Sequence, residues 1–347
     1  MGRSLESARR PTLLAVDAGT TNTRVWLVGE EGVLVRRDVG VGARDTSRDG
    51  NNARLRAALR ALIGDVLRAA PPDRPAPQRI AAAGMITSAQ GLVEVAHVPA
   101  PAGLAEISAH AHEALVADVS DRPFLFVPGV RTEARPGAPE GVGATDVMRG
   151  EETLCLGLLR QGRLERGGLL LNVGSHWKLI RVDEEGRVAW SLTSLSGEMM
   201  QAVRTQTVLA SAVPEGTASA VDPHWVREGL AEARRAGLAR ALFCVRLLEI
   251  AGESSAAARH AFLLGAFIGA DLDRLQATSA LPPGAPISVA GDEKTGGAWS
   301  AALSEADHPV RRLSAEDVEA GFLSGLRAVA EAHAAHGTPG IDTASNR

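Results

Sequence analysis

The chain has 347 residues, of which 45% are apolar, and its formal net charge at neutral pH is −4. This length and apolar content allow two domains with ordinary cores, and the small negative charge gives no general attraction to nucleic acid or anionic membrane. No apolar run reaches the roughly 18 residues that a membrane span needs, and two cysteines, Cys155 and Cys244, are too few for a disulfide scaffold. Residues 1–10 contain three arginines and no apolar segment, so we expect no secretory signal, a cytoplasmic location, and no nucleic-acid or membrane partner.

Apolar runs alternate with amphipathic helical stretches along the chain, a pattern typical of an α/β fold. In the first half we expect strands at 13–16, 24–28, 33–37, 80–83 and 124–127. Helices are expected at 54–69, 104–117 and 146–160. In the second half the periodicity predicts helices at 196–212, 223–236, 254–275 and 315–335.

The segment that begins at residue 169 repeats the pattern of the opening segment at residue 12. In both, an apolar strand ends on a polar residue, Asp17 or Asn172, and a glycine and hydroxyl residues follow. A second strand, an acidic turn ("GEEG" or "DEEG") and a third strand then come in the same order. Because a match of so many elements in order is hard to obtain by chance, we interpret it as a duplicated fold. We expect an N-terminal domain over 11–145, a C-terminal domain over 146–336 and a loose tail over 337–347.

The two repeated loops have the composition of phosphate-binding loops. Small residues allow the backbone to approach phosphate oxygens, and short hydroxyl side chains donate hydrogen bonds to them. If the two domains face one another, the loops could hold a polyphosphate between them. The residues that we expect to bind it are Gly19, Thr20, Thr21 and Asn22 in the first loop, and Gly174, Ser175, His176 and Lys178 in the second.

A third loop, "VAGDEKTGG", joins a short strand to a helix that we expect the chain to enter through its double glycine. Strand–glycine–helix junctions present free N–H groups and the positive end of a helix dipole, which suits phosphate. Gly291 and Gly296 are therefore further cofactor candidates. For this loop taken alone, an ordinary tight turn is the preferred interpretation.

Asp17 stands at the end of a buried strand and directly before the first loop. A carboxylate in this place can hold Mg²⁺, directly or through water, and the metal neutralises the phosphates. The alternative is a carboxylate that bonds the amides of its own loop. The repeated loop favours the metal-binding role.

The segment "TDVMRGEE" concentrates charged residues at an expected helix start. Asp146 would cap this helix, and the two glutamates would complement its dipole. Arg149 could also pair with a substrate carboxylate. Asp146 could accept the proton of an attacking hydroxyl, with Glu151 and Glu152 as rival bases.

The stretch that follows the strand at 80–83 is a long polar and glycine-rich loop, where substrate contacts are common. The substrate-binding candidates are Met85, Ser88, Gln90, Arg24 and Arg149.

With these motifs the chain resembles the 2-keto-3-deoxygalactonate kinases (2-dehydro-3-deoxygalactonokinases) of the actin/hexokinase/Hsp70 superfamily. The matching segments occur in family order over residues 12–335 and are "DAGTTNTRVWL", "GMITS", "PGVR", "DVMRGEE", "GSHWK" and "SGE". The resemblance implies a duplicated actin-like (ribonuclease H-like) fold with a central cleft. It also implies ATP and Mg²⁺, transfer of the γ-phosphoryl group to the 6-hydroxyl of a 2-keto-3-deoxy sugar acid, and a role in galactonate degradation. Arg149 and residues 85–90 would lie near the sugar acid.

Two other functions stay open at this point. A phosphohydrolase of the same fold would use water as the nucleophile, positioned by Glu151 or Glu198. A non-catalytic sugar-acid sensor is disfavoured because the chain has neither an appended DNA-binding helix pair nor a basic patch. The apolar helical stretch at 261–272 could lie in the interior, which we prefer, or in the interface of a homodimer.

Overall fold

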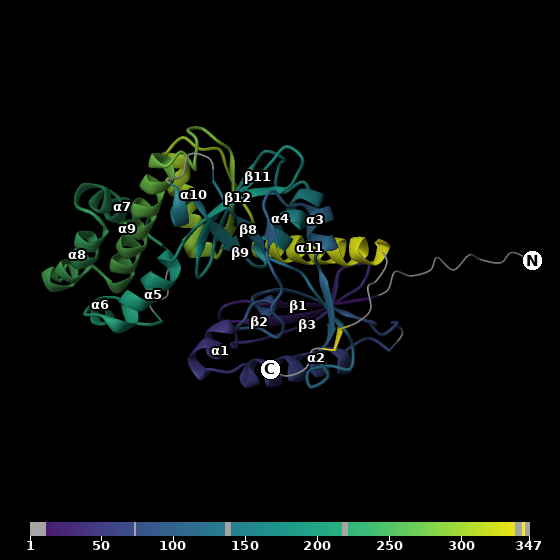
Figure 1. The fold of residues 1–347 in the computed structure, drawn as a ribbon. Coiled ribbons are helices and arrows are strands. Elements are labelled where there is room, and N and C mark those ends of the chain that lie inside the picture. Colours follow the sequence, from purple (N-terminus) through teal and green to yellow (C-terminus); the bar gives the residue numbers. More distant parts are fainter. Residues whose placement is uncertain (1–11, 73, 136–139, 217–220, 337–341, 344–347) are drawn as a thin grey trace, which may run out of the picture. The chain divides into compact units, whose positions relative to one another are not determined.

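The computed structural model describes residues 12–72, 74–135, 140–216, 221–336 and 342–343 (Figure 1). The chain forms two compact units. Unit 1 contains the described residues up to Arg131, the segment Val147–Arg160 and the described residues from Ala320 onward. Unit 2 contains Thr132–Asp146 and Gln161–Glu319. We expected everything between 146 and 336 in the second domain, whereas two of its helical segments return to unit 1.

The core of unit 1 is a seven-stranded sheet in the order β15-β6-β7-β4-β1-β2-β3. Strand β1 pairs antiparallel with β2 and parallel with β4. The short strand β15 lies in the expected tail, whose other residues, 337–341 and 344–347, fall outside the described part. The strands are β1 (Leu13–Ala18), β2 (Thr23–Val28), β3 (Val33–Val39), β4 (Ile80–Gly84), β6 (His112–Leu115), β7 (Phe124–Phe126) and β15 (Asp342–Thr343).

Helices cover both faces of this sheet (Figure 1). On one face, Leu14 and Val16 of β1 pack with Leu55 and Leu59 of α2 in one apolar cluster. On the other face, the Trp26 ring of β2 lies 6.0 Å from a phenylalanine ring of α11. The helices of unit 1 are α1 (Ala43–Asp49), α2 (Ala53–Arg68), α3 (Leu104–Ala109), α4 (Glu151–Arg160) and α11 (Ala315–Ala335), with a 3-10 turn at Met85–Thr87.

Glycines explain why α4 and α11 pack together in unit 1. A Cβ atom on Gly157 of α4 would overlap the carbonyl oxygen of Gly321 in α11, and one on Gly325 would overlap the carbonyl oxygen of Thr153. The two helix backbones therefore touch directly. Such close contact between helices far apart in the sequence cannot be derived from periodicity.

Unit 2 repeats the plan of unit 1 with a five-stranded sheet in the order β12-β11-β10-β13-β14. Strand β10 pairs antiparallel with β11 and parallel with β13, as β1 does with β2 and β4. These strands are β10 (Leu169–Val173), β11 (Trp177–Val182), β12 (Val188–Ser194), β13 (Ile287–Gly291) and β14 (Val310–Arg312). The helices are α5 (Ser196–Gln206), α6 (Leu209–Ala212), α7 (Pro223–Ala236), α8 (Leu238–Ala251), α9 (Ala256–Ala277) and α10 (Glu293–Glu305). The duplicated α/β fold is thus confirmed.

Four expected elements differ from the structure. The helix expected at 196–212 is interrupted at 207–208 and forms α5 and α6. The helix expected at 104–117 ends at Ala109, and the strand β6 follows it. The helix expected from Asp146 begins at Glu151, because Asp146–Met148 forms β9, which joins β8 (Val130–Thr132) and β5 (Val98–Pro99) in a third sheet. The expected helix entry at the double glycine is wrong: α10 begins at Glu293, and its N-cap is Asp292. Helix α8 was not expected.

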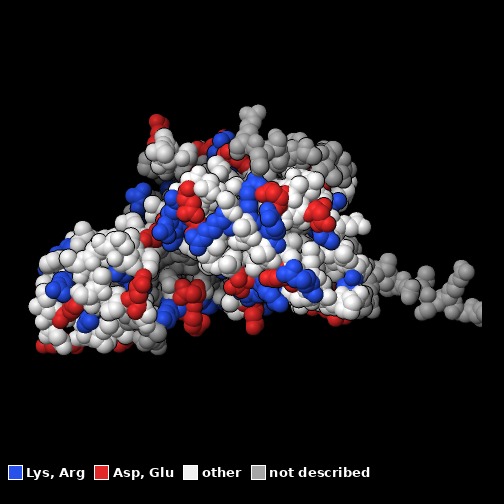
Figure 2. Space-filling view, turned by 90° about the horizontal axis from the view of Figure 1, so that it is seen from below, with Lys and Arg blue, Asp and Glu red and all other residues white. Residues whose placement is uncertain are grey.

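The stretch at 261–272 lies in α9, and most of its apolar residues are buried, as we preferred. Among the described residues, no helix is both long enough and apolar enough to cross a membrane. Figure 2 shows basic and acidic side chains interspersed over the face that it draws.

Candidate active site

The two repeated loops are supported in the same way. After β1, N–H groups at the start of α1 donate to the carbonyl oxygens of Gly19 (3.1 Å) and Thr20 (2.9 Å). After β10, an N–H group at the start of α5 donates to the carbonyl oxygen of Ser175 at 2.8 Å. In each unit a glycine makes this approach feasible, because a Cβ on Gly42 or Gly197 would overlap these loop carbonyl groups. We call Gly42 and Gly197 the brace glycines.

The bracing has a chemical consequence for the loops. The bound carbonyl oxygens point toward the helix starts, and Gly19 donates its N–H within the loop to Asn22 at 2.8 Å. With these carbonyl oxygens engaged, the hydroxyl side chains and other N–H groups of the loops suit an anion such as phosphate. The same number of residues separates Gly19 from Gly42 and Gly174 from Gly197, a signal that sequence reasoning missed.

Asp17 lies at the end of β1 and pairs with Arg24 on the neighbouring strand. The guanidinium Nη1 of Arg24 is 3.0 Å from Oδ2 of Asp17, whose side chain is 21% exposed. Loss of hydration raises the pKa of Asp17; the positive charge of Arg24 opposes this rise, and the negative charge of Glu151 adds to it. The structure therefore brings Asp17, Arg24 and Glu151 into one charged group. Arg24, a substrate-binding candidate, contacts the proposed metal ligand.

Two glycines allow the start of α4 to approach Asp17. Gly84 and Gly150 both have positive φ, 91° and 104°. A Cβ on Gly84 would lie 3.1 Å from Oδ1 of Asp17, and one on Gly150 would lie 3.3 Å from the Cα of Gly84. The end of β4 and the residues before α4 are thus in close contact beside the carboxylate. Only glycine adopts both the conformation and the packing without strain.

Glu152 is completely buried and is held by backbone and hydroxyl donors. Its two carboxylate oxygens accept the N–H of Gly150 at 2.9 and 2.8 Å, and the hydroxyl of Thr153 donates at 2.9 Å. Burial, together with the charge of Glu151, raises the pKa of Glu152 to about 7. This carboxylate is engaged in fixing the start of α4 and is inaccessible to a substrate hydroxyl. Of the two rival glutamates, Glu151 is the one that is partly exposed.

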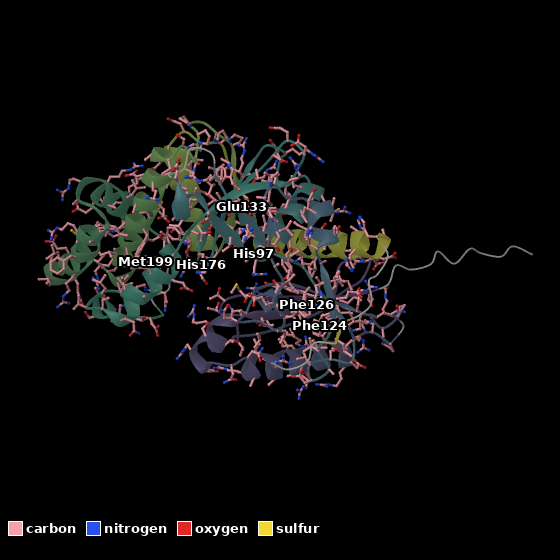
Figure 3. The ribbon with its side chains drawn as sticks, viewed as in Figure 1. His97, Phe124, Phe126, Glu133, His176 and Met199 are labelled. Atoms are coloured by element: carbon pink, nitrogen blue, oxygen red, sulfur yellow. The ribbon has the colours of Figure 1, made fainter. Side chains whose placement is uncertain are left out.

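Arg149 is oriented by a set of acceptors in unit 1. Its guanidinium donates to the hydroxyl of Thr87 (2.9 Å) and the carbonyl oxygen of Val95 (2.9 Å), and it lies 3.3 Å from Nδ1 of His97, which Figure 3 labels. Burial lowers the pKa of Arg149, and nearby glutamates oppose this effect. Because a guanidinium carries five N–H groups, these contacts fix its orientation without using all of its donors. Thr87 belongs to the 85–90 loop, so the structure joins Arg149 to the expected substrate loop.

Within that loop, Ser88 has a local role. Its hydroxyl donates to the carbonyl oxygen of Met85 at 2.7 Å and accepts the N–H of Gln90 at 3.2 Å. The expected substrate donor therefore closes the turn of its own loop, and Met85 and Gln90 are half-buried beside it.

Asp146 does not cap a helix, contrary to our expectation. It is the first residue of β9 and belongs to unit 2, where Oδ2 accepts the hydroxyls of Ser191 (2.6 Å) and Thr193 (2.9 Å) of β12. Arg149 and Glu151, the other two catalytic candidates, belong to unit 1. The chain thus divides the expected trio between its two units.

The second loop carries charged groups of its own. Lys178 is buried on β11, opposite Asn172 in the ladder. His176, which Figure 3 labels, lies 3.7 Å from the carboxylate of Glu198 at the start of α5. The strand and helix next to the second loop thus carry one buried lysine and one carboxylate–imidazole contact.

The junction of β13 and α10 is a capped turn. The carboxylate of Asp292 accepts the N–H groups of Lys294 (2.8 Å) and Thr295 (2.9 Å), so the helix supplies its own anion. Arg312 donates to the carbonyl oxygen of Gly291 at 2.8 Å. A Cβ on Gly296 would overlap the guanidinium of Arg312, so the glycine leaves room for this contact. These contacts favour the ordinary-turn interpretation of Gly291 and Gly296 that we preferred for this loop.

A cavity beside this junction was missed by the sequence reasoning. It measures about 160 Å³ and lies between α7 and α10, with Val226, Leu230 and Ala298 among its lining residues and Gly297 at its wall. Arg227 and Glu305 pair across it at 3.2 Å. Since its residues come from separate helices, no sequence motif marks it.

Two units with the same strand order around β1 and β10, and with loops braced alike, define an actin-like ATPase fold of the sugar-kinase type. Residues 17–329 match the model of the 2-keto-3-deoxy-galactonokinase family, and the chain belongs to this family. It is 30% identical over 320 residues to the probable 2-dehydro-3-deoxygalactonokinase DgoK1 of Rhizobium meliloti (strain 1021). This match covers 91% of this chain and 96% of the relative. A crystal structure assigned as a 2-dehydro-3-deoxygalactonokinase from Sinorhizobium meliloti superposes with a TM-score of 0.71 at 28% identity, over 92% of this chain and 96% of that chain. The protein is a phosphotransferase, a sugar-acid kinase.

Proposed function

We propose that the protein transfers the γ-phosphoryl group of ATP to the 6-hydroxyl of 2-keto-3-deoxygalactonate in the degradation of galactonate, with Mg²⁺ as its metal. The observation that carries this proposal is the pair of braced loops, one in each unit, with Asp17 before the first and Lys178 after the second. Loops that present N–H and hydroxyl donors, together with a carboxylate and a buried lysine, are the parts that phosphoryl transfer requires. Family membership supports the acceptor.

The donors around Asp17 fit Mg²⁺. This ion keeps several waters and usually binds through one or two carboxylates together with phosphate oxygens. Asp17 supplies one such carboxylate, with Glu151 close enough to perturb its pKa. No cluster of three His, Cys, Asp or Glu side chains occurs in the described ranges, so an all-protein cage is not expected. When bound, Mg²⁺ would neutralise phosphate charge.

For ATP, we propose that the cavity between α7 and α10 takes the adenine base and that the second loop takes the phosphates. The cavity is mostly apolar, as a site for a flat aromatic base should be. Ser175, His176 and Lys178 supply a hydroxyl, an imidazole and a buried positive charge for the phosphates.

For the sugar acid, we propose that Arg149 binds the carboxylate and that residues 85–90 position the chain of the substrate. The acceptors that orient Arg149 reduce the entropy cost of binding a carboxylate. Glu151 is the proposed base for the 6-hydroxyl, because it is partly exposed and lies near Asp17 in the same unit as Arg149. Glu152 is buried, and Asp146 already accepts two hydroxyl groups on Oδ2.

The test is a coupled ADP-release assay with Mg²⁺–ATP and a panel of sugar acids and neutral sugars. We expect turnover with 2-keto-3-deoxygalactonate, a 6-phosphate product by NMR, and loss of turnover in Asp17→Asn. Glu151→Gln should lower kcat by about 10²- to 10⁴-fold, the usual loss for a general base. The matched control is Asp38→Asn, an exposed carboxylate on β3.

Other outcomes would change specific parts of the proposal. Turnover with a different acid alone would move the substrate and leave the phosphate chemistry in place. ADP release without any acceptor would identify a hydrolase. A large kcat loss in Asp146→Asn but not in Glu151→Gln would assign the base to Asp146.

A further inference from the structure

Helix α8 carries apolar side chains on its inner face and also on its outer face. Its inner face contributes Ala241 and Val245 to the core of unit 2. On its outer face, Phe243, Leu247 and Ile250 are 50%, 38% and 66% exposed. A helix that is apolar all round is normally a buried helix, because a surface helix presents polar residues to water. Among the described residues, no segment buries these three side chains.

These residues form one continuous stripe. Phe243, Leu247 and Ile250 are spaced four and three residues apart, which places them on one side of the helix. Helix α6 lies beside the stripe, since the hydroxyl of Ser211 contacts Glu249 at 3.3 Å. We call Phe243, Leu247 and Ile250 the α8 face.

Charged residues stand at the two ends of the stripe with opposite signs. Arg240 is exposed in the first turn of α8, with its guanidinium 5.8 Å from the centre of the Phe243 ring. Glu253 is exposed directly after the C-cap, Gly252. Between them, Arg246 and Glu249 pair with each other. A stripe flanked by balanced charges does not match an anionic lipid surface, which selects for an excess of Lys and Arg.

We propose that the α8 face is the interface of a homodimer, in which two copies of α8 pack antiparallel about a two-fold axis near Leu247. A two-fold interface must be self-complementary. The antiparallel arrangement puts Phe243 opposite Ile250 of the second copy and Leu247 beside the same residue across the axis. It also puts Arg240 at the end of the helix where Glu253 of the second copy lies, so each contact occurs twice.

The helix dipole supports this orientation. Arg240 lies near the positive N-terminal end of its own helix, where a positive charge is unfavourable. In the antiparallel pair it faces the negative C-terminal end of the other α8 and the carboxylate of Glu253. Within the chain the charge of Arg240 acts on Glu232 of α7, and the dimer adds a second carboxylate. A parallel arrangement would bring the two Arg240 side chains together.

The experiment is sedimentation equilibrium of the full chain across micromolar concentrations. We expect the wild-type protein to have twice the mass of the chain. Leu247→Glu should raise the dissociation constant about 30-fold or more, which is the effect expected when a residue at the centre of an interface is changed. Val33→Glu, an exposed valine on β3 at 43%, is the matched control and should leave the mass unchanged. Circular dichroism verifies that each variant is folded.

A charge-reversal cycle at the exposed residues Arg240 and Glu253 tests the orientation. Arg240→Glu and Glu253→Arg should each weaken the dimer about tenfold, because like charges then face each other twice. The double variant should recover the wild-type dissociation constant. A monomeric wild type, or a dimer that Leu247→Glu leaves intact, would overturn the interface. Failure of the double variant to recover would overturn the antiparallel pairing.

Discussion

Glu152 provides a test of the packing at the start of α4 that does not depend on substrate. Its carboxylate is 0% exposed, and its hydrogen-bond donors are the N–H of Gly150 and the hydroxyl of Thr153. Burial raises its pKa from 4.5 to about 7. The folded protein therefore holds a proton on Glu152 at a pH where the unfolded chain has released it.

The sign and size of the effect follow from this difference. Between about pH 4.5 and 7 the folded state binds more protons than the unfolded state, so the free energy of unfolding falls as pH rises. The loss is complete above about pH 7. At about 1.4 kcal/mol for each pH unit of difference in pKa, the loss amounts to about 3 kcal/mol. Glu152→Gln keeps an oxygen for the N–H of Gly150 and removes the titration, so the variant should lack this part of the decrease.

Amide hydrogen exchange is the assay, because it reports on α4 separately from unit 2, and the two units need not unfold together. After correction for the intrinsic pH dependence of exchange, protection of α4 in the wild type should fall from about pH 5 to 7. In Glu152→Gln this decrease should be smaller by about 3 kcal/mol, from about 1.4 kcal/mol for each pH unit of difference in pKa. The two proteins are compared at each pH, because burial lowers the pKa of His260 in unit 2 to about 4, and the stability of that unit also depends on pH. Glu31→Gln, an exposed glutamate in the β2–β3 turn, controls for the loss of one negative charge. If Glu152→Gln shows the same decrease as the wild type, buried Glu152 is not its cause and our reasoning is refuted.

Two glycine substitutions test the packing in the same quantitative way. Gly157→Ala forces α4 away from Gly321. It should lower the free energy of unfolding by about 3 kcal/mol, which exceeds the roughly 1 kcal/mol gained in helix propensity. An unchanged urea midpoint would contradict the direct backbone contact. Gly297→Ala adds a methyl group in α10 where no atom lies within 4 Å. It should stabilise the protein by up to about 1 kcal/mol, and raise KM for ATP by filling the wall of the α7–α10 cavity. An unchanged KM for ATP would indicate that the adenine base binds elsewhere.

The local order of elements was predictable from the sequence. Strands β1, β2 and β3 and helices α2, α7 and α11 were predicted within one or two residues, because each has a clear apolar period. The repetition of strand, polar loop, strand and acidic turn predicted the duplicated fold, and the pairing of β10 with β11 and β13 confirms it. The positions of Asp17 and of both glycine loops at strand ends follow from the same pattern.

Contacts between distant segments were decided only by the tertiary structure. The sequence placed Asp146 on a helix, but β9 forms because its backbone finds partners in β8, and Asp146 finds two hydroxyl groups on β12. Helices α4 and α11 belong to unit 1 because glycines let their backbones touch. The high pKa of Glu152 likewise depends on burial that no local pattern encodes. Periodicity reports which face of an element is apolar, whereas the partner of that face is fixed by packing among segments far apart in the chain.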